Sequence, residues 1–175
     1  MPTTPVPECV AWAIEKLAIA PSDHLLEIGC GPGIAAAAAC KKLGTGTYVG
    51  VDRSSVAIAR ATGRNLSNIE SGKARFLRAW FAEADLGGNR FDKVFAIRVN
   101  FFWQGGQREL PLIQAVLKPK GHLTIVYEPP RKDMIPGTVR KVRANLEAGG
   151  FLITEVLTEI RQSELLCIQA VRTRR

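Results

Sequence analysis

Five short apolar runs, separated by segments with helical features, constrain the fold of this 175-residue chain more than any other feature. The runs begin near His24, Thr47, Ala74, Phe91 and His122. Helical segments are expected between them at 34–43, 54–66 and 108–117, whereas 82–89 predicts only a short helix or a loop. Strands that alternate with helices predict right-handed crossovers, and therefore a parallel sheet with helices on both faces.

The last part of the chain departs from this alternation. After a helical segment that the pair Gly149-Gly150 can end, two β-rich runs follow at 151–160 and 164–172. Only a short polar turn joins them, and a link that short makes an antiparallel hairpin. The sequence therefore predicts seven strands, five joined by crossovers and two closing the chain as a hairpin.

A glycine-rich loop, in the stretch LLEIGCGPG at 25–33, follows the first predicted strand. Its three glycines let the backbone turn tightly and approach a ligand where a Cβ would clash. The alanine-rich helix that follows points its N-terminal amides and its positive dipole end into the loop. Open α/β sheets bind ligands beyond the carboxyl ends of their strands, so a ligand site is expected here.

Asp52 ends the second predicted strand, 19 positions after Gly33. A carboxylate at that place can accept hydrogen bonds from both hydroxyls of an adenosine ribose. Alternatively, Asp52 only caps the helix that starts at Ser54-Ser55. Its pairing with the glycine loop favours ribose binding.

A dinucleotide such as NAD is a competing interpretation, because Gly31, Gly33 and Ala36 satisfy the pattern G-x-G-x-x-A. Three features count against it. Glu27 has no role in a dinucleotide site, no second nucleotide-binding half or substrate domain is expected, and a closing hairpin does not belong to the six-stranded dinucleotide fold.

Composition and length predict a single domain over 1–175, with 1–20 as a candidate N-terminal cap helix. Hydrophobic residues make up 46% of the chain, enough for a buried core, yet no apolar run approaches the ~20 residues that cross a bilayer. The four cysteines form no C-x-x-C pair and no zinc spacing. We therefore expect reduced thiols, no metal, no membrane association and a cytoplasmic location.

A formal net charge of +8 suggests a second class of partner. Basic residues gather at 131–132, at 140–143 and at the C-terminal end. Such clusters can bind phosphates, but no RNA-binding signature accompanies them. A nucleic-acid substrate therefore stays as an alternative to a small molecule.

Together these motifs resemble the class I S-adenosylmethionine-dependent methyltransferases, of the small UbiE/type-11-like kind, over about residues 11–171. LLEIGCGPG resembles the first motif of that family, VGVD its second, FDKVFAIRVNFFW its fourth-strand motif, and LKPKGHLTIV the segment that leads into its fifth strand. The resemblance implies a Rossmann-like, mostly parallel seven-stranded sheet in the order 3-2-1-4-5-7-6, with strand 7 antiparallel. It also implies S-adenosyl-L-methionine as cofactor and methyl transfer by in-line displacement.

The resemblance further implies which residues bind the cofactor. In the family the glycines hold the methionine moiety, Glu27 orients the loop and the cofactor's amino group, and Asp52 binds the ribose. Arg53 would lie beside the adenine, and 98–100 near the transferred methyl. The complete expected set is Glu27, Gly29, Cys30, Gly31, Gly33, Asp52, Arg53, Ala79, Trp80 and Arg98.

One position departs from the family pattern. An acidic residue that often follows the third strand and holds the adenine amino group is absent, since 78–81 reads RAWF. Trp80 either stacks on the adenine or belongs to the core. Glu83 and Asp85 are the remaining substitutes.

No catalytic residue can be assigned, and none is required, because a sulfonium methyl is already activated and the protein mainly aligns the reactants. Asn100, after the fourth strand, and Glu128, at the end of the fifth, are the two candidates. His24 and His122 each open a strand, so we expect both at the opposite edge of the sheet. The methyl acceptor is expected to be a small molecule. A non-catalytic domain that only binds the cofactor stays an alternative to an enzyme. The sequence does not indicate an oligomeric state.

Overall fold

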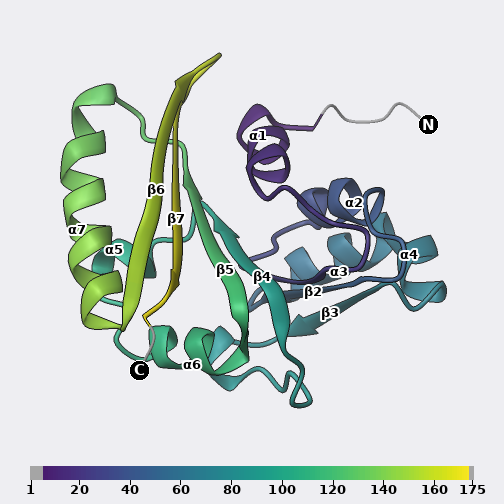
Figure 1. Ribbon diagram of the computed structural model, residues 1–175. Helices are drawn as coiled ribbons and strands as arrows, with labels where there is room; N and C mark the ends of the chain where they lie inside the picture. The colour runs from purple at the N-terminus through teal and green to yellow at the C-terminus, as the bar shows by residue number, and fades with distance from the viewer. Residues whose placement is uncertain (1–5, 174–175) are drawn as a thin grey trace.

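Seven strands pair into one sheet, in the order β3-β2-β1-β4-β5-β7-β6, in the computed structural model, which describes residues 6–173 (Figure 1). The strands are β1 (His24–Ile28), β2 (Thr47–Asp52), β3 (Ala74–Arg78), β4 (Phe91–Ile97), β5 (Leu117–Tyr127), β6 (Phe151–Ile160) and β7 (Glu164–Arg172). The first five strands run parallel, and β7 is antiparallel to both β5 and β6. The predicted fold class and strand order are confirmed.

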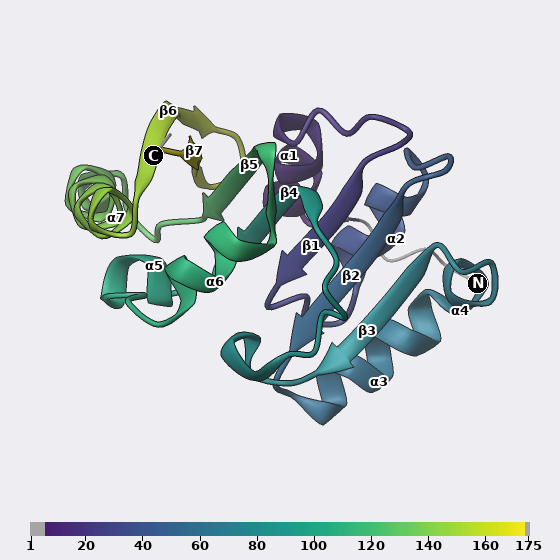
Figure 2. The same ribbon diagram turned by 60° about the horizontal axis from the view of Figure 1, so that its bottom comes forward.

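Helices cover the two faces of this sheet unequally. They are α1 (Glu8–Lys16), α2 (Ile34–Cys40), α3 (Ser55–Arg64), α4 (Leu66–Glu70), α5 (Phe101–Gln104), α6 (Glu109–Val116) and α7 (Ile135–Ala148), with short 3₁₀ turns η1 (Phe81–Glu83) and η2 (Lys132–Met134). Figure 2 shows α5, α6 and α7 beside the β4–β7 half, and α2, α3 and α4 behind β1–β3. The connection from β3 to β4 holds only η1.

Two apolar cores follow from this arrangement. One joins the β4–β7 half to α5, α6 and α7, and includes Phe102, Ile113 and Val142. The other joins α1 and α2 to the opposite face through Trp12, which is 0% exposed, and the small residues of α2. Small side chains let α2 pack close to the sheet, which sets the position of the loop before it.

The elements differ from the sequence prediction at several places. The helix expected over 34–43 ends at Cys40. The helix expected over 54–66 ends at Arg64, because Asn65 leaves the helical region (φ −115°, ψ 24°) before α4 begins. The fifth strand begins at Leu117 rather than His122, since Leu117 already pairs with Phe91 across a register shift. The helix α5 was not expected from the aromatic run that follows the fourth strand.

The N-terminal helix α1 lies between α2 and the tip of the β6–β7 hairpin (Figure 1). The Trp12 indole donates a hydrogen bond to Glu159, and a Glu8 carboxylate oxygen accepts one from the Gln162 amide at 2.7 Å. These bonds join the two ends of the described chain. No helix of the described residues is long and apolar enough to cross a membrane.

Candidate active site

The glycine loop turns sharply between β1 and α2. Gly29, Gly31 and Gly33 all adopt positive φ, at 74°, 50° and 71°. A Cβ added to Gly33 would lie 2.7 Å from the side-chain nitrogen of Asn65 and 2.9 Å from Ala61. Both the backbone conformation and the close packing against α3 therefore require glycine at that position.

The end of α3 holds the carbonyl groups of this loop. Asn65, which is 0% exposed, donates from its amide nitrogen to the Gly33 carbonyl at 3.0 Å and to the Ala61 carbonyl at 2.9 Å. Arg64 donates from Nε to the Pro32 carbonyl at 3.1 Å. Sequence reasoning missed Asn65; the available signal was an amide near the end of a predicted helix, which is equally common on a solvent face.

Asp52 joins the glycine loop to the turn after β2. One carboxylate oxygen accepts from the Gly31 amide and the other from the Ser54 amide, both at 2.9 Å. Asp52 is not the helix cap, because the side chain of Ser54 fills that role by accepting from the Ala57 amide at 3.2 Å. The capping interpretation of Asp52 is therefore wrong, although Asp52 does support the turn that leads into α3.

A cavity of about 730 Å³ lies at the carboxyl edge of the sheet, beside this loop. Eight of the residues singled out from the sequence line it: Gly29, Asp52, Arg53, Ala79, Trp80, Glu83, Arg98 and Asn100. Asp85, the other candidate substitute for the family's acidic residue, does not line it. Five others, all within the described part of the chain, do not: Glu27, Cys30, Gly31, Gly33 and Glu128. Segments that follow β1, β2, β3 and β4 thus meet around one space of the size typical of small-molecule sites.

Trp80 stands at the rim of this cavity with Arg53 against its ring. The Trp80 side chain is 57% exposed, and the Arg53 guanidinium carbon lies 4.5 Å from the ring centroid. The core interpretation of Trp80 is therefore wrong. The pair offers a flat, positively charged surface where the family's acidic residue is missing.

Glu27 lies behind the loop, away from the cavity. It is 3% exposed and accepts a hydrogen bond from the hydroxyl of Tyr48 on β2. Burial raises the pKa of the Glu27 carboxyl to about 8, an effect that the Tyr48 hydrogen bond only partly offsets. Tyr48 is a second residue that sequence reasoning missed, since an aromatic residue in a buried strand reads simply as core.

Arg98, directly after β4, adopts a positive φ of 59°. Its guanidinium pairs with Glu128 at 3.3 Å, and Glu128 also accepts a hydrogen bond from the Ser163 hydroxyl at 2.6 Å. Glu128 thereby connects the end of β5 and the hairpin tip to Arg98. Its carboxylate is engaged by these partners and does not face the cavity.

The two histidines lie toward the amino edge as expected, although only His24 opens its strand and His122 lies within β5. His24 starts β1, and its Nδ1 shares a hydrogen bond with the Thr47 hydroxyl at the start of β2, at 2.7 Å. His122 pairs with Lys93 near the beginning of β4. Both are at the amino edge, so neither contributes to the cavity at the carboxyl edge.

Comparisons with known proteins agree with this geometry. Residues 25–121 match the model of a family described as methyltransferase domain. The chain is 26% identical over 144 residues to the uncharacterized methyltransferase YdaC of Bacillus subtilis (strain 168), covering 80% of this chain and 77% of that protein.

Solved structures share the fold. A SAM-dependent methyltransferase from Aquifex aeolicus superposes with a TM-score of 0.75 at 18% identity, over 92% of this chain and 88% of that one. A magnesium protoporphyrin IX methyltransferase from Synechocystis PCC 6803 with bound SAM superposes with a TM-score of 0.67 at 19% identity, over 96% of this chain and 78% of that one. The family match, the strand order and the loop-lined cavity lead to one conclusion: the chain belongs to the methyltransferase domain family.

Proposed function

We propose that the carboxyl-edge cavity binds S-adenosylmethionine and a small-molecule acceptor, and that the methyl group passes between them by in-line displacement. The observation that carries this proposal is the 2.9 Å hydrogen bond from the Gly31 amide to Asp52. It couples the glycine loop to a carboxylate that lines the same cavity.

The residues present fit the cofactor. Each Asp52 oxygen already accepts one amide hydrogen bond and keeps a further lone pair for a ribose hydroxyl. A Cβ on Gly29 would meet Val99 at 2.7 Å, so only glycine fits where the loop packs against the segment that follows β4. Arg53 and Trp80, with Ala79 beside them, provide the surface for the adenine.

The other members of the expected cofactor set act from behind this surface. Cys30, Gly31 and Gly33 shape the loop that carries the methionine moiety. Glu27 supports that loop from the sheet, through Tyr48. Their contribution is to hold the loop conformation rather than to line the cavity.

When bound, the cofactor supplies an activated sulfonium methyl, so the protein's own residues need chiefly to orient the acceptor and exclude water. Asn100 lines the cavity at the start of α5, where its amide can hydrogen-bond an acceptor hydroxyl or amine. Arg98 reaches the same cavity, and Glu128 acts through Arg98 as a positioning residue. Phe81 and Phe101 provide apolar walls.

A small acceptor and a cytoplasmic location are part of the same proposal. The cavity has a volume suited to a cofactor with a compact partner. All four cysteines are buried and free, as expected for a protein kept in a reducing compartment.

Calorimetric titration with S-adenosylhomocysteine, alongside NAD, tests the proposal. We expect micromolar binding of S-adenosylhomocysteine and none of NAD. The substitution Asp52→Asn should weaken the binding of S-adenosylhomocysteine by about 30-fold, because it replaces a charged hydrogen-bond acceptor worth about 2 kcal/mol.

Glu147→Gln is the matched control, because Glu147 is an exposed carboxylate on α7 that pairs with Arg143. It should bind S-adenosylhomocysteine as the wild type does. Equal affinity of Asp52→Asn and wild type, or tighter binding of NAD, contradicts the assignment of this cavity.

A further inference from the structure

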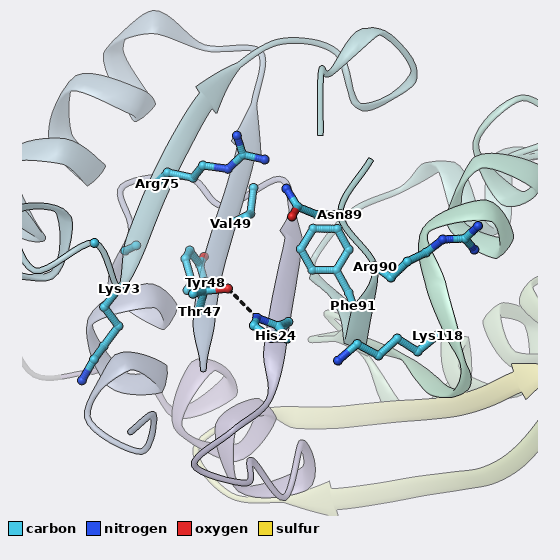
Figure 3. A pocket seen from close by; sticks show the side chains of 12 residues that line it. His24, Thr47, Tyr48, Val49, Lys73, Arg75, Asn89, Arg90, Phe91 and Lys118 are labelled. Atoms are coloured by element: carbon cyan, nitrogen blue, oxygen red, sulfur yellow. Dashed lines mark hydrogen bonds between the residues drawn. The ribbon is translucent and has the colours of Figure 1, made fainter. Parts of the chain in front are cut away.

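A second cavity, of about 470 Å³, lies at the amino edge of the same sheet (Figure 3). Residues that begin β1, β2 and β3 line it, together with the loop before β4 and Lys118 near the start of β5. The methyltransferase cavity is at the other end of these parallel strands. The two cavities share none of their lining residues.

The charges of the two cavities differ sharply. Three arginines and three acidic residues line the methyltransferase cavity, so its formal charge is balanced. Four cationic residues and no acidic residue line the amino-edge cavity: Lys73, Arg75, Arg90 and Lys118. Four of the chain's 24 lysine and arginine residues therefore gather at one cavity, with no acidic residue among its lining.

Only one of these four cations has a carboxylate partner among residues 6–173, since Lys118 pairs with Asp92 at 2.7 Å. Lys73 donates to the Leu43 carbonyl at 2.8 Å, and Arg75 donates to the Leu86 carbonyl at 3.1 Å. Carbonyl groups satisfy hydrogen bonds but leave the positive charge uncompensated. An anion would relieve the repulsion among these cations.

The side chains are arranged to meet an extended anion. In Figure 3 the Arg75 guanidinium and Lys118 approach the cavity from opposite sides, with Asn89 and His24 between them. Lys73 and Arg90 extend outward at the two rims. Arg75 uses one of its nitrogens to hold Leu86, which leaves donors of its planar fork for a bidentate contact with a phosphate oxygen pair.

We propose that this amino-edge cavity is a phosphate-binding site, separate from the methyl-transfer site, that takes adjacent phosphates of one ligand. Cations lie across the cavity and also at its two rims, so a ligand with several adjacent phosphates can contact more of them than a single ion can. An RNA strand and a small oligophosphate both carry that chemistry, and the test below distinguishes them. The proposal does not depend on the assignment of the cofactor.

Fluorescence anisotropy with a labelled single-stranded oligouridine measures binding of RNA. Calorimetric titration with tripolyphosphate, which also serves as a competitor of the RNA, measures binding of a small oligophosphate. The test variant is Arg75→Gln/Arg90→Gln. The matched control is Lys132→Gln/Arg140→Gln, which removes two exposed cations of η2 and α7 that line neither cavity.

We expect the wild type to bind RNA with a slope of log K against log salt of about −2.8, for four contacts to a single strand. The test variant should show a slope of about −1.4 and roughly 10- to 30-fold weaker binding at about 0.1 M salt. The control should keep the wild-type slope. Tripolyphosphate should displace the RNA from the wild type.

Tripolyphosphate that binds the wild type and not the test variant, without RNA binding, assigns the site to a small phosphorylated ligand. Absence of binding of either probe, or equal losses in the test and control variants, overturns the proposal. Arg90→Gln alone guards against a folding defect, because Arg90 is exposed and its removal leaves the Arg75–Leu86 contact in place. Affinity for S-adenosylhomocysteine should be unchanged in the test variant, and a parallel loss would contradict the separation of the two sites.

Discussion

Arg98 is one of only two non-glycine residues with positive φ among residues 6–173, the other being Ala18. A side chain in the left-handed region costs of order 1 kcal/mol and persists where surrounding structure imposes it. Here the Arg98 amide donates to the Val126 carbonyl at 2.8 Å, and the guanidinium pairs with Glu128. The strain therefore lies at a residue that lines the carboxyl-edge cavity and whose guanidinium is held by Glu128.

Arg98→Gly and Arg98→Ala form a matched pair that isolates this strain, since both remove the guanidinium. We expect the glycine variant to be more stable to urea than the alanine variant by about 1 kcal/mol, because only glycine adopts this φ without cost. Equal stabilities would show that the backbone at 98 relaxes when the side chain is removed.

Glu27 is a second residue whose environment has a measurable consequence. In the unfolded chain the Glu27 carboxyl loses its proton near the ordinary pKa of 4.5. In the native protein burial raises this pKa to about 8, so the carboxyl keeps its proton up to about that pH. The native state thus holds more protons in this window, so its stability falls as pH rises, by up to about 1.4 kcal/mol per pH unit.

Glu27→Gln should remove this contribution, because an amide mimics the protonated carboxyl and still accepts from Tyr48. The free energy of unfolding, measured in urea at several values between about pH 5 and pH 8, should fall more steeply with pH for the wild type than for the variant. Parallel pH profiles of the two proteins would show that Glu27 is ionised in the native state throughout.

At the scale of elements, α1 and η1 present two tryptophans in opposite environments. Trp12 on α1 is 0% exposed in the core beside α2, whereas Trp80 before η1 is 57% exposed against Arg53. The first holds a helix on the sheet, and the second forms part of the cavity rim. Substitution of the two should therefore separate stability from binding.

Trp12→Ala should lose about 3–5 kcal/mol of unfolding free energy, as expected for a large buried aromatic residue. The Trp80→Ala variant should lose less than about 1 kcal/mol of unfolding free energy. It should nevertheless bind S-adenosylhomocysteine more weakly, as measured by calorimetry. A Trp80 variant with wild-type affinity would remove this residue from the adenine surface.

At the scale of the whole molecule, the sheet has one cavity at each edge, and the β3–β4 connection supplies residues to both. This connection consists of η1 and a loop, and its Phe81 and Leu86 belong to the apolar core. At the carboxyl edge, the residues that line the cavity include equal numbers of cations and anions. At the amino edge, cations near the starts of the strands line the cavity without any acidic residue. The two cavities therefore differ in chemistry because different segments supply their lining residues.

Local sequence patterns predicted much of the fold and part of the candidate site. The alternation of apolar runs and helical segments predicted the parallel sheet, and three polar residues between two β-rich runs predicted the hairpin. LLEIGCGPG and Asp52 predicted a loop and a carboxylate at one edge, which the hydrogen bond from Gly31 to Asp52 now joins. These features are encoded within short segments, where backbone geometry and residue period act directly.

Other features depend on residues distant in the sequence, and only the tertiary structure decided them. Trp80 became a rim residue and Glu128 a partner of Arg98 because of what folds beside them. The basic clusters visible in the sequence, at 131–132 and 140–143, are not those that line the amino-edge cavity. Its cations come from segments up to 45 positions apart, from Lys73 to Lys118, and only the pairing of parallel strands aligns their amino ends into one site.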